Sequence, residues 1–208
     1  SRVDGVRLPA GWDKEIIVVD DGSHDGSREI LKSLEHKFIV VYHEKNSGKG
    51  TAVQTGIRRA TGNYMIIQDA DLELDPRDMA LLTEALERGD ADVICGSRYV
   101  SGRTKECPVM LYAGVWCITK LVNTLYGLRL TDVCACYKLF PREVSDAFGP
   151  GRFEADMLFT PALARRGVSF AEVPISYHPR GPKEGKKIRY RDGVKAMALI
   201  LRDWLTHR

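Results

Sequence analysis

Hydrophobic runs alternate with helical patterns through the first half of the chain. Four short runs, rich in valine and isoleucine and of the length of a buried strand, lie at residues 15–19, 38–42, 64–67 and 92–96. Three segments with apolar residues at helical spacing lie between them, at residues 23–34, 51–60 and 76–86. This β-α-β-α-β-α-β order predicts an α/β fold with a mostly parallel, doubly wound sheet and helices on both faces.

The second half of the chain has a less regular pattern. Residues 109–126 and 152–166 are predicted as helices, and residues 168–177 as a strand. From His178 onward Lys and Arg predominate, and residues 194–205 then place apolar side chains at helical spacing. We therefore expect two parts, an α/β domain over residues 1–177 and a basic loop with a C-terminal amphipathic helix over residues 178–208.

Composition and charge exclude several classes of protein. The chain has 208 residues and a formal net charge of +3, which is too small to indicate a nucleic-acid partner. No segment reaches the roughly 18 consecutive apolar residues of a membrane-spanning helix, and no signal peptide is recognised. The five cysteines form no paired Cys-x-x-Cys zinc pattern, so reduced thiols in a cytoplasmic setting are expected.

Two carboxylates, Asp69 and Asp71, directly follow the predicted strand at 64–67. In open α/β sheets, ligands bind at the carboxyl ends of the strands, and Mg²⁺ is usually held by one or two carboxylates together with substrate phosphates. The pair therefore indicates a metal-assisted site for a phosphate-bearing substrate. For such a pair alone, a simpler interpretation is favoured, in which Asp71 caps the next helix and Asp69 ends the strand.

Two further segments combine a strand end or loop with a helix start. Asp20 and Asp21 precede Gly22 and Ser23, and a carboxylate there suits either a nucleoside or an ordinary turn with a helix cap. Lys49 lies in a glycine-containing loop, but His43 stands where a P-loop requires glycine. A helix N-terminus with a nearby lysine still suits a phosphate or a base, and a plain loop-to-helix junction is an equal alternative.

Taken in order, these segments resemble the family 2 glycosyltransferases. The motifs that carry the resemblance read VVDDGS at 18–23, NSGKG at 46–50, QDADLE at 68–73 and CGSR at 95–98. Further motifs resemble the polyprenyl-phosphate hexosyltransferases, the group of the dolichyl-phosphate mannose and glucose synthases. They read TD at 131–132, CYKLF at 136–140, EVPISY at 172–177, EGKKI at 184–188 and RDG at 191–193.

The resemblance implies the nucleotide-diphospho-sugar transferase fold known as GT-A. These enzymes begin with an apolar strand in the middle of the sheet, and residues 1–12 contain no such strand. We therefore expect the N-terminal strand of the fold to be missing from this sequence.

The resemblance also implies roles for individual residues. Asp69 and Asp71 would hold Mg²⁺ or Mn²⁺ at the donor diphosphate, with Glu73 as a further ligand, and Asp71 would be catalytic. Asp20, Asp21 and Lys49 would join Asp69 and Asp71 in binding the nucleotide sugar. Arg98 would be catalytic and would meet the acceptor phosphate, with added positive charge from the basic residues Lys186, Lys187 and Arg189.

The implied reaction moves a hexose from GDP-mannose, or alternatively UDP-glucose, to a polyprenyl phosphate with inversion. The phosphate acceptor is already largely anionic at neutral pH and needs no dedicated base. A basic loop before an amphipathic helix suits the cytoplasmic face of an anionic membrane, and simple packing of that helix on the domain is nearly as plausible.

Two other functions remain open from the sequence. One is a glycosyltransferase with a saccharide hydroxyl as acceptor, for which Glu154 or Asp156 would serve as the base. The other is a nucleotide-binding or scaffold protein without catalysis. Release of nucleoside diphosphate with each acceptor distinguishes the three functions.

Overall fold

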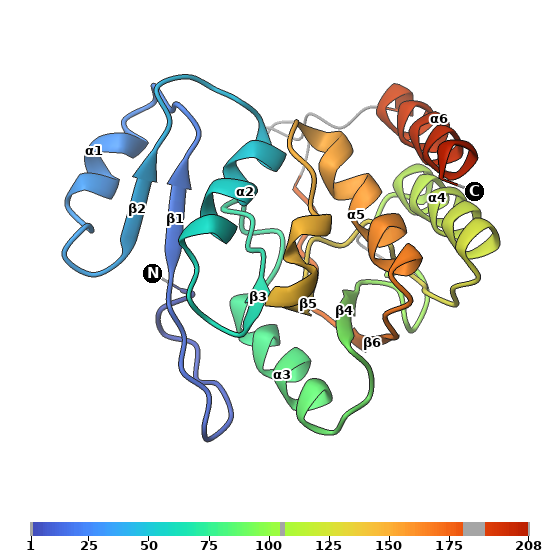
Figure 1. Ribbon diagram of the computed structural model, residues 1–208, viewed down its shortest axis with the longest axis horizontal. Helices are drawn as coiled ribbons and strands as arrows, with labels where there is room; N and C mark the ends of the chain where they lie inside the picture. Colours follow the sequence, from blue (N-terminus) through green and yellow to red (C-terminus); the bar gives the residue numbers. More distant parts are fainter. Residues whose placement is uncertain (1, 105–106, 181–189, 208) are drawn as a thin grey trace.

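The computed structural model describes residues 2–104, 107–180 and 190–207, whose strands form two sheets (Figure 1). The smaller sheet pairs β1 (Ile17–Asp20) with β2 (Ile39–Tyr42) in parallel. Valine and isoleucine fill most of both strands, and branched side chains favour extended backbone. The connecting helix α1 (Ser27–Lys32) has no buried residue, so this part of the molecule has little core of its own.

The larger sheet has four strands in the order β3-β5-β4-β6. These strands are β3 (Tyr64–Ile66), β4 (Val93–Ser97), β5 (Lys138–Pro141) and β6 (Phe170–Pro174). β4 and β6 are parallel, whereas β5 lies antiparallel between β3 and β4. Three of the four strands therefore run in one direction.

Five longer helices are described, together with two 3-10 helices. They are α2 (Lys49–Arg59), α3 (Met79–Glu87), α4 (Val109–Tyr126), α5 (Phe153–Arg165) and α6 (Tyr190–Thr206), with 3-10 helices η1 (Pro76–Asp78) and η2 (Arg142–Ala147). Helices α4 and α6 lie side by side at one edge of the molecule, next to α5 (Figure 1). Pro76 occupies the first position of η1, where its fixed φ angle and missing N–H suit a helix start. Every helix expected from the sequence is present.

Strand β4 shows how helices come to cover both faces of the sheet. All five of its residues are buried. Ile94 belongs to a core cluster with Leu82 of α3, whereas Val93 and Cys95 belong to a second cluster with Phe159 of α5. Since successive side chains of a strand point to opposite faces, α3 and α5 lie on opposite sides of β4.

The α/β class is confirmed, with two differences in detail. Strand β5 was not predicted, and the sheet is divided between β1 and β3. A groove of about 750 Å³ lies at this division, and its apolar lining includes Ile17, Val19, Val53, Ile57 and Met65. Within the described residues no strand precedes β1, in agreement with the expectation for residues 1–12.

A third core cluster joins α4, α5 and α6. Ile118 and Val122 of α4 are buried with Met157 of α5 and with Ala196 and Ile200 of α6. By length and composition alone, α4 is apolar enough to cross a membrane, contrary to the sequence expectation. These side chains place one face of α4 in a core with two neighbouring helices, while only 22% of the helix is buried.

Candidate active site

The site begins in the loop that leaves β3, where Asp69 and Asp71 lie as predicted at the carboxyl end of the strand. Asp71 accepts a hydrogen bond from the backbone N–H of Glu73 at 3.1 Å, which tightens the turn. Between them Leu72 has a φ of 63°, a left-handed conformation that side chains with a Cβ rarely adopt. Such strain is concentrated at functional sites, because the surrounding structure must hold it.

Lys49 at the start of α2 joins Asp69 to a carboxylate from another helix. Its Nζ lies 2.7 Å from Oδ1 of Asp69 and 2.7 Å from Oδ2 of Asp156 in α5. Burial disfavours the charged ammonium, but Cys136 and the two carboxylates together outweigh that effect, so the pKa of Lys49 lies well above its ordinary value. The Lys49 ammonium therefore joins Asp69 to Asp156, which lies more than a hundred positions after Lys49 in the sequence.

Residues 69–73 form an acidic loop with three carboxylates, and Arg180 binds two of them, Asp71 and Glu73. Its Nη2 lies 2.8 Å from Oδ2 of Asp71, and its Nε lies 3.3 Å from Oε1 of Glu73. A backbone bond from the N–H of His178 to the carbonyl of Glu73, at 2.9 Å, holds the two segments side by side. Sequence reasoning missed Arg180, because nothing in a run of basic residues indicates which one folds back onto the acidic loop.

The donor chemistry of the loop fits a hard divalent cation, since Asp69, Asp71 and Glu73 offer only oxygen ligands. Within the described residues, however, no three metal-ligating side chains are gathered around one point. Asp69 faces Lys49, while Asp71 and Glu73 face Arg180. These carboxylates could therefore hold a divalent cation only in an arrangement in which Arg180 has left Asp71 and Glu73.

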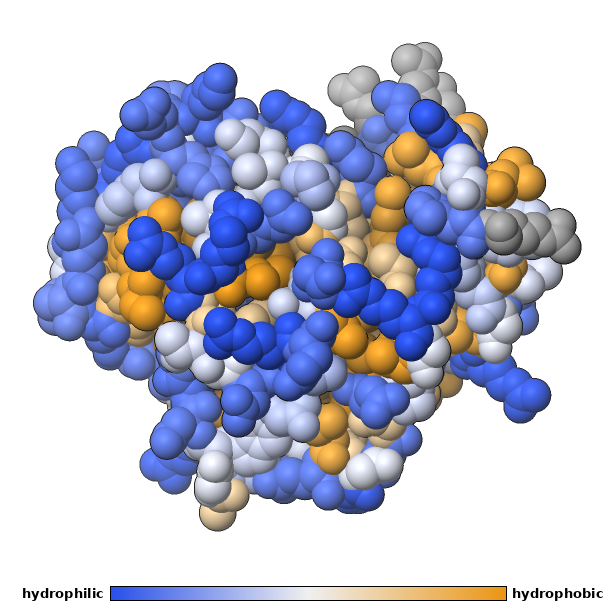
Figure 2. All heavy atoms as spheres, viewed as in Figure 1, coloured by the Kyte–Doolittle hydropathy of each residue, from blue (hydrophilic) through white to orange (hydrophobic). Residues whose placement is uncertain are grey.

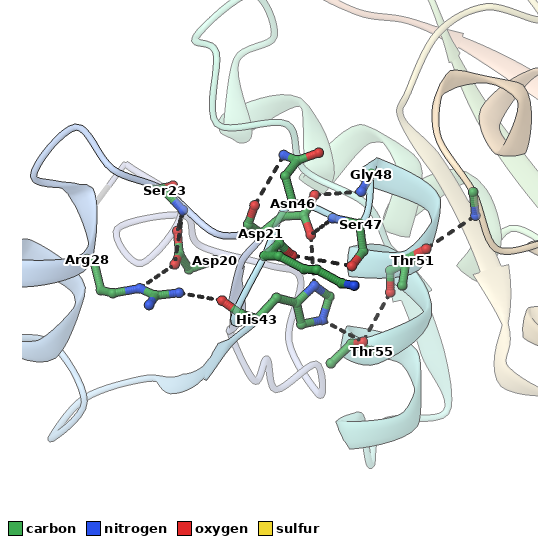
Figure 3. A network of polar contacts seen from close by, with 12 residues as sticks. Asp20, Asp21, Ser23, Arg28, His43, Asn46, Ser47, Gly48, Thr51 and Thr55 are labelled. Carbon is green, nitrogen blue, oxygen red and sulfur yellow. Dashed lines mark hydrogen bonds and ion pairs between the residues drawn. The ribbon is translucent and has the colours of Figure 1, made fainter.

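Asp21 fastens the end of β1 to the start of α2 (Figure 3). It accepts hydrogen bonds from the backbone N–H groups of Ser47, at 2.9 Å, and Gly48, at 2.8 Å, and its Oδ1 lies 2.8 Å from Nδ1 of His43. Burial opposes ionisation, yet these donors outweigh it and hold the pKa of Asp21 below its ordinary value. Asp21 therefore positions the loop at 46–50.

Asp20 is buried and accepts hydrogen bonds from Ser23 and Arg28, which follow it in the chain (Figure 3). Nε of Arg28 donates to its Oδ2 at 2.9 Å, and the backbone N–H of Ser23 donates to its Oδ1 at 3.2 Å. Gly22 beside it has a φ of +76°, and a Cβ there would lie 2.7 Å from the backbone nitrogen of Asn46. The turn thus requires glycine at this position. Asp20 stabilises the same turn through its bond to the backbone of Ser23.

Arg98 forms a buried ion pair with Asp132. Its Nε and Nη2 donate to the two carboxylate oxygens at 2.6 and 2.8 Å, and the Asp132 side chain is fully shielded. The rings of Tyr99 and Tyr177 also lie within 5.2 and 4.9 Å of the guanidinium carbon. Burial opposes the charge, but Asp132 outweighs it and raises the pKa of Arg98 above its ordinary value.

The two candidate bases in α5 lie in different surroundings. Glu154 accepts a hydrogen bond from the backbone N–H of Arg152 at 3.0 Å and so caps its own helix. Asp156, by contrast, contacts Lys49. The structure therefore brings together Lys49, Asp69 and Asp156, and separately Asp71, Glu73 and Arg180. The predicted phosphate ligands Lys186, Lys187 and Arg189 lie outside the described residues.

Comparison with known proteins identifies the family. Residues 10–149, more than half of the chain, match the family described as glycosyl transferase family 2, and the chain belongs to this family. Similar proteins include the glycosyltransferase AglD of Haloferax volcanii, 29% identical over 199 residues, and the low-salt glycan biosynthesis hexosyltransferase Agl6 of the same organism, 31% identical over 192 residues. These matches cover 91% and 89% of this chain but only 31% and 45% of the two relatives.

The fold is also that of a solved GT-A structure. Glucosyl-3-phosphoglycerate synthase from Mycobacterium tuberculosis, in complex with UDP, superposes with a TM-score of 0.69 at 19% identity, covering 97% of this chain and 73% of that one. The same enzyme in complex with Mn²⁺, UDP-glucose and phosphoglyceric acid gives a TM-score of 0.67 at 20% identity, covering the same shares of both chains. The GT-A fold expected from the sequence is confirmed.

Proposed function

We propose that this protein transfers a hexose from a nucleotide sugar to a polyprenyl phosphate, with GDP-mannose favoured and UDP-glucose as the alternative donor. The observation that carries the proposal is the convergence of Asp69 and Asp71 with Lys49 and Arg180 at the end of β3. Four charged groups from three distant segments suit a diphosphate and its cation. The family match supports glycosyl transfer as the reaction class.

Asp69 and Asp71, with Glu73 nearby, would hold Mg²⁺ or Mn²⁺ at the donor diphosphate. When bound, such an ion supplies neutralisation of the charge that develops on the departing nucleoside diphosphate. Lys49 lies against Asp69 and orients that carboxylate. Charge-assisted contacts of this kind fix geometry before the reaction, and positioning accounts for much of the catalysis.

The proposed transfer is one in-line displacement. An oxygen of the acceptor phosphate forms a bond to the anomeric carbon while the bond from that carbon to the diphosphate oxygen breaks, and the configuration inverts. The attacking oxygen is already anionic at neutral pH. Arg98 faces Asp132, so we assign the acceptor phosphate first to the basic segment with Lys186, Lys187 and Arg189, and give Arg98 a supporting role.

An exposed apolar stripe supports a lipid-bound acceptor. On α6 four exposed apolar residues follow one another at helical spacing, namely Val194, Ala198, Leu201 and Leu205. Lys195 and Arg202 lie exposed on the same helix, and the adjoining α4 exposes Met110 and Trp116. Hydrophobic surface is visible at the outer edge of α6 and α4, at upper right in Figure 2. Such a face suits the cytoplasmic surface of an anionic membrane.

Vesicle binding tests the membrane contact. The double variant Leu201→Glu/Leu205→Glu should lose most of its sedimentation with phosphatidylglycerol vesicles, because both side chains are exposed on the stripe. Ile30→Glu alters an apolar residue on α1 that is about as exposed as Leu205, and this variant should sediment like the wild type. Equal loss in both variants, or in neither, contradicts the assignment of the stripe.

A saccharide hydroxyl is the second candidate acceptor, and the position of Asp156 favours it. This carboxylate contacts Lys49, which in turn contacts Asp69, so it lies where a base for a hydroxyl nucleophile is needed. Glu154 is less suited, because it caps its own helix. The two acceptors therefore differ in their dependence on Asp156.

Release of nucleoside diphosphate tests the function directly. With Mn²⁺ and GDP-mannose or UDP-glucose, we expect turnover on adding dolichyl or undecaprenyl phosphate, and a loss of at least about a hundredfold in Asp71→Asn. Asp156→Asn should keep most activity toward a lipid phosphate. Turnover only with a saccharide, abolished in Asp156→Asn, supports the second candidate, and no turnover with either acceptor contradicts both.

A further inference from the structure

Arg180 occupies the oxygen atoms that a divalent cation would need. The side chains of Asp71 and Glu73 are 27% and 15% exposed, and the Arg180 side chain that covers them is 33% exposed. The backbone N–H of Arg180 also donates to Oε1 of Glu73 at 3.2 Å. Main chain and guanidinium of one residue thus close over one half of the acidic loop.

The covering is built into the fold. Beyond β6, Tyr177 forms an antiparallel bridge with Leu74, and His178 bonds to the carbonyl of Glu73. These backbone contacts bring residue 180 beside the acidic loop, where the guanidinium reaches two carboxylates. The pair is partly open to solvent, so the arginine can leave when a competing charge arrives.

Two positive groups cannot share one carboxylate pair without mutual repulsion, because unit charges about 4 Å apart interact strongly even at intermediate dielectric. A divalent ion on Asp71 therefore has to displace the guanidinium. A diphosphate offers the displaced guanidinium a replacement anion, since its planar N–H groups match phosphate oxygens. Lys49 does not provide the same exchange, because it is held between Asp69 and Asp156.

We propose that Arg180 is an internal counter-cation that competes with the divalent ion for Asp71 and Glu73 and so makes metal binding depend on the donor diphosphate. The inference rests on the proposed metal role of Asp69 and Asp71. Without nucleotide, Arg180 weakens metal binding. With nucleotide bound, the guanidinium moves to the diphosphate, and metal binding becomes stronger. By linkage, the metal and the nucleotide raise each other's affinity by the same factor.

Direct measurement of Mn²⁺ affinity tests this proposal without any turnover. The concentration of free Mn²⁺ is followed by electron paramagnetic resonance, with the protein alone and with saturating GDP or UDP. Arg180→Gln should bind Mn²⁺ about tenfold more tightly than the wild type when no nucleotide is present. The factor by which GDP or UDP strengthens Mn²⁺ binding should fall about tenfold in the same variant.

Matched variants separate charge from packing. Arg180→Lys keeps the positive charge, so without nucleotide its Mn²⁺ affinity should stay within about threefold of that of the wild type. Arg77→Gln removes an arginine that pairs with Asp75 just beyond the same loop, and should leave Mn²⁺ affinity unchanged. Arg180→Met keeps the aliphatic stem and provides a second neutral variant, which should agree with Arg180→Gln.

The outcomes distinguish this inference from the proposed function. Unchanged or weaker Mn²⁺ binding in both neutral variants, with the wild type binding normally, overturns the role of Arg180 and leaves the metal site standing. Absence of Mn²⁺ binding in the wild type, with and without nucleotide, overturns the metal assignment and this inference with it. Stronger binding in Arg77→Gln as well would show a general charge effect and would also overturn it.

Discussion

At the scale of single residues, the basic side chains around the site are buried to different degrees. Arg98 and Asp132 are shielded almost completely, with 11% and 0% of their side chains exposed, whereas Lys49 and Arg180 pair with carboxylates that solvent still reaches. Removing one partner of a buried pair leaves an uncompensated charge, but a partly exposed pair exchanges at small cost. Arg98 therefore contributes mainly to stability and Arg180 to ligand exchange, whereas Lys49 is held in place by two carboxylates.

Asp132→Asn tests the stabilising role of the buried pair. The variant should lose about 3–5 kcal/mol in the free energy of unfolding, because the Arg98 guanidinium stays buried without a counter-charge. Urea denaturation at pH 7 measures the loss. Asp146→Asn, which breaks an exposed pair with Arg166, should change stability by less than about 0.5 kcal/mol. Similar losses in the two variants contradict the difference in burial.

Asp75→Asn tests a pH dependence close to the acidic loop. Hydrogen bonds from Arg77 lower the pKa of Asp75 to about 2. A carboxyl group whose pKa is lower in the folded state stabilises the fold above its unfolded pKa, near 4, and loses this effect as pH falls toward 2. Because Arg77 is largely exposed, we expect a loss of about 1 kcal/mol at pH 7 that shrinks as pH falls from about 4 toward 2. Urea titrations at several pH values measure the stability difference between the variant and the wild type. A difference that does not change with pH contradicts a stabilising role of the ionised Asp75 carboxylate.

At the scale of elements, the sequence pattern predicts long elements better than short or mixed ones. Helix α4 has the predicted bounds, since eighteen residues give a clear period. Strand β5 was missed because Lys138 within it is polar although it is buried, whereas β1 and β2, of the same length, consist mainly of valine and isoleucine. Its ammonium is satisfied by backbone carbonyls, including that of Val133 at 3.2 Å, and only tertiary structure supplies such partners.

The candidate site shows the same limit. Asp69 and Asp71 could be predicted because they directly follow a strand, and strand ends meet at one edge of the sheet. The partners of these residues could not be predicted, because Asp156 and Arg180 reach the site only through packing of α5 and through backbone pairing beyond β6. Local sequence contains no record of contacts between segments so far apart.

Gly50→Ala tests the close packing of α2 on α5. A Cβ at Gly50 would lie 2.5 Å from the Cβ of Ala155 and 2.9 Å from the carbonyl oxygen of Gly151, so one helix has to shift. We expect a loss of about 1–3 kcal/mol in a thermal or urea denaturation experiment.

Gly114→Ala is the matched control for this substitution. Gly114 lies within α4 with no neighbouring atom inside 4 Å of an added Cβ, and alanine favours helix more than glycine does. This variant should be more stable by about 0.5–1 kcal/mol. Destabilisation of both variants, or of neither, contradicts the close approach of α2 and α5.

At the scale of the whole molecule, the two sheets differ in how well they are buried. Strand β4 is buried over all five residues, whereas β1 has one buried residue and β2 none. The groove beside β1 separates the smaller sheet from the larger one, and α2 packs against both β1 and α5. The smaller sheet is therefore held mainly through one helix.

Hydrogen exchange tests this difference in burial. Amides of β1 and β2 should exchange at least about tenfold faster than those of β4, because regions with few buried apolar contacts open at lower free energy. Mass spectrometry of peptides covering residues 17–42 and 93–97 measures both rates. Equal protection of the two sheets would show that the molecule opens only as a unit.

The division between the sheets also has a consequence for ligands. Asp20 ends the weakly held β1 and Asp21 follows it, whereas Asp69 follows β3 in the firmly held sheet. A nucleotide that contacts both the end of β1 and the loop after β3 would connect the two sheets. Part of its binding free energy would then be used to hold the smaller sheet in place. Its measured affinity would then be lower than its contacts alone suggest, and exchange at residues 17–42 would slow on binding while exchange in β4 stays the same.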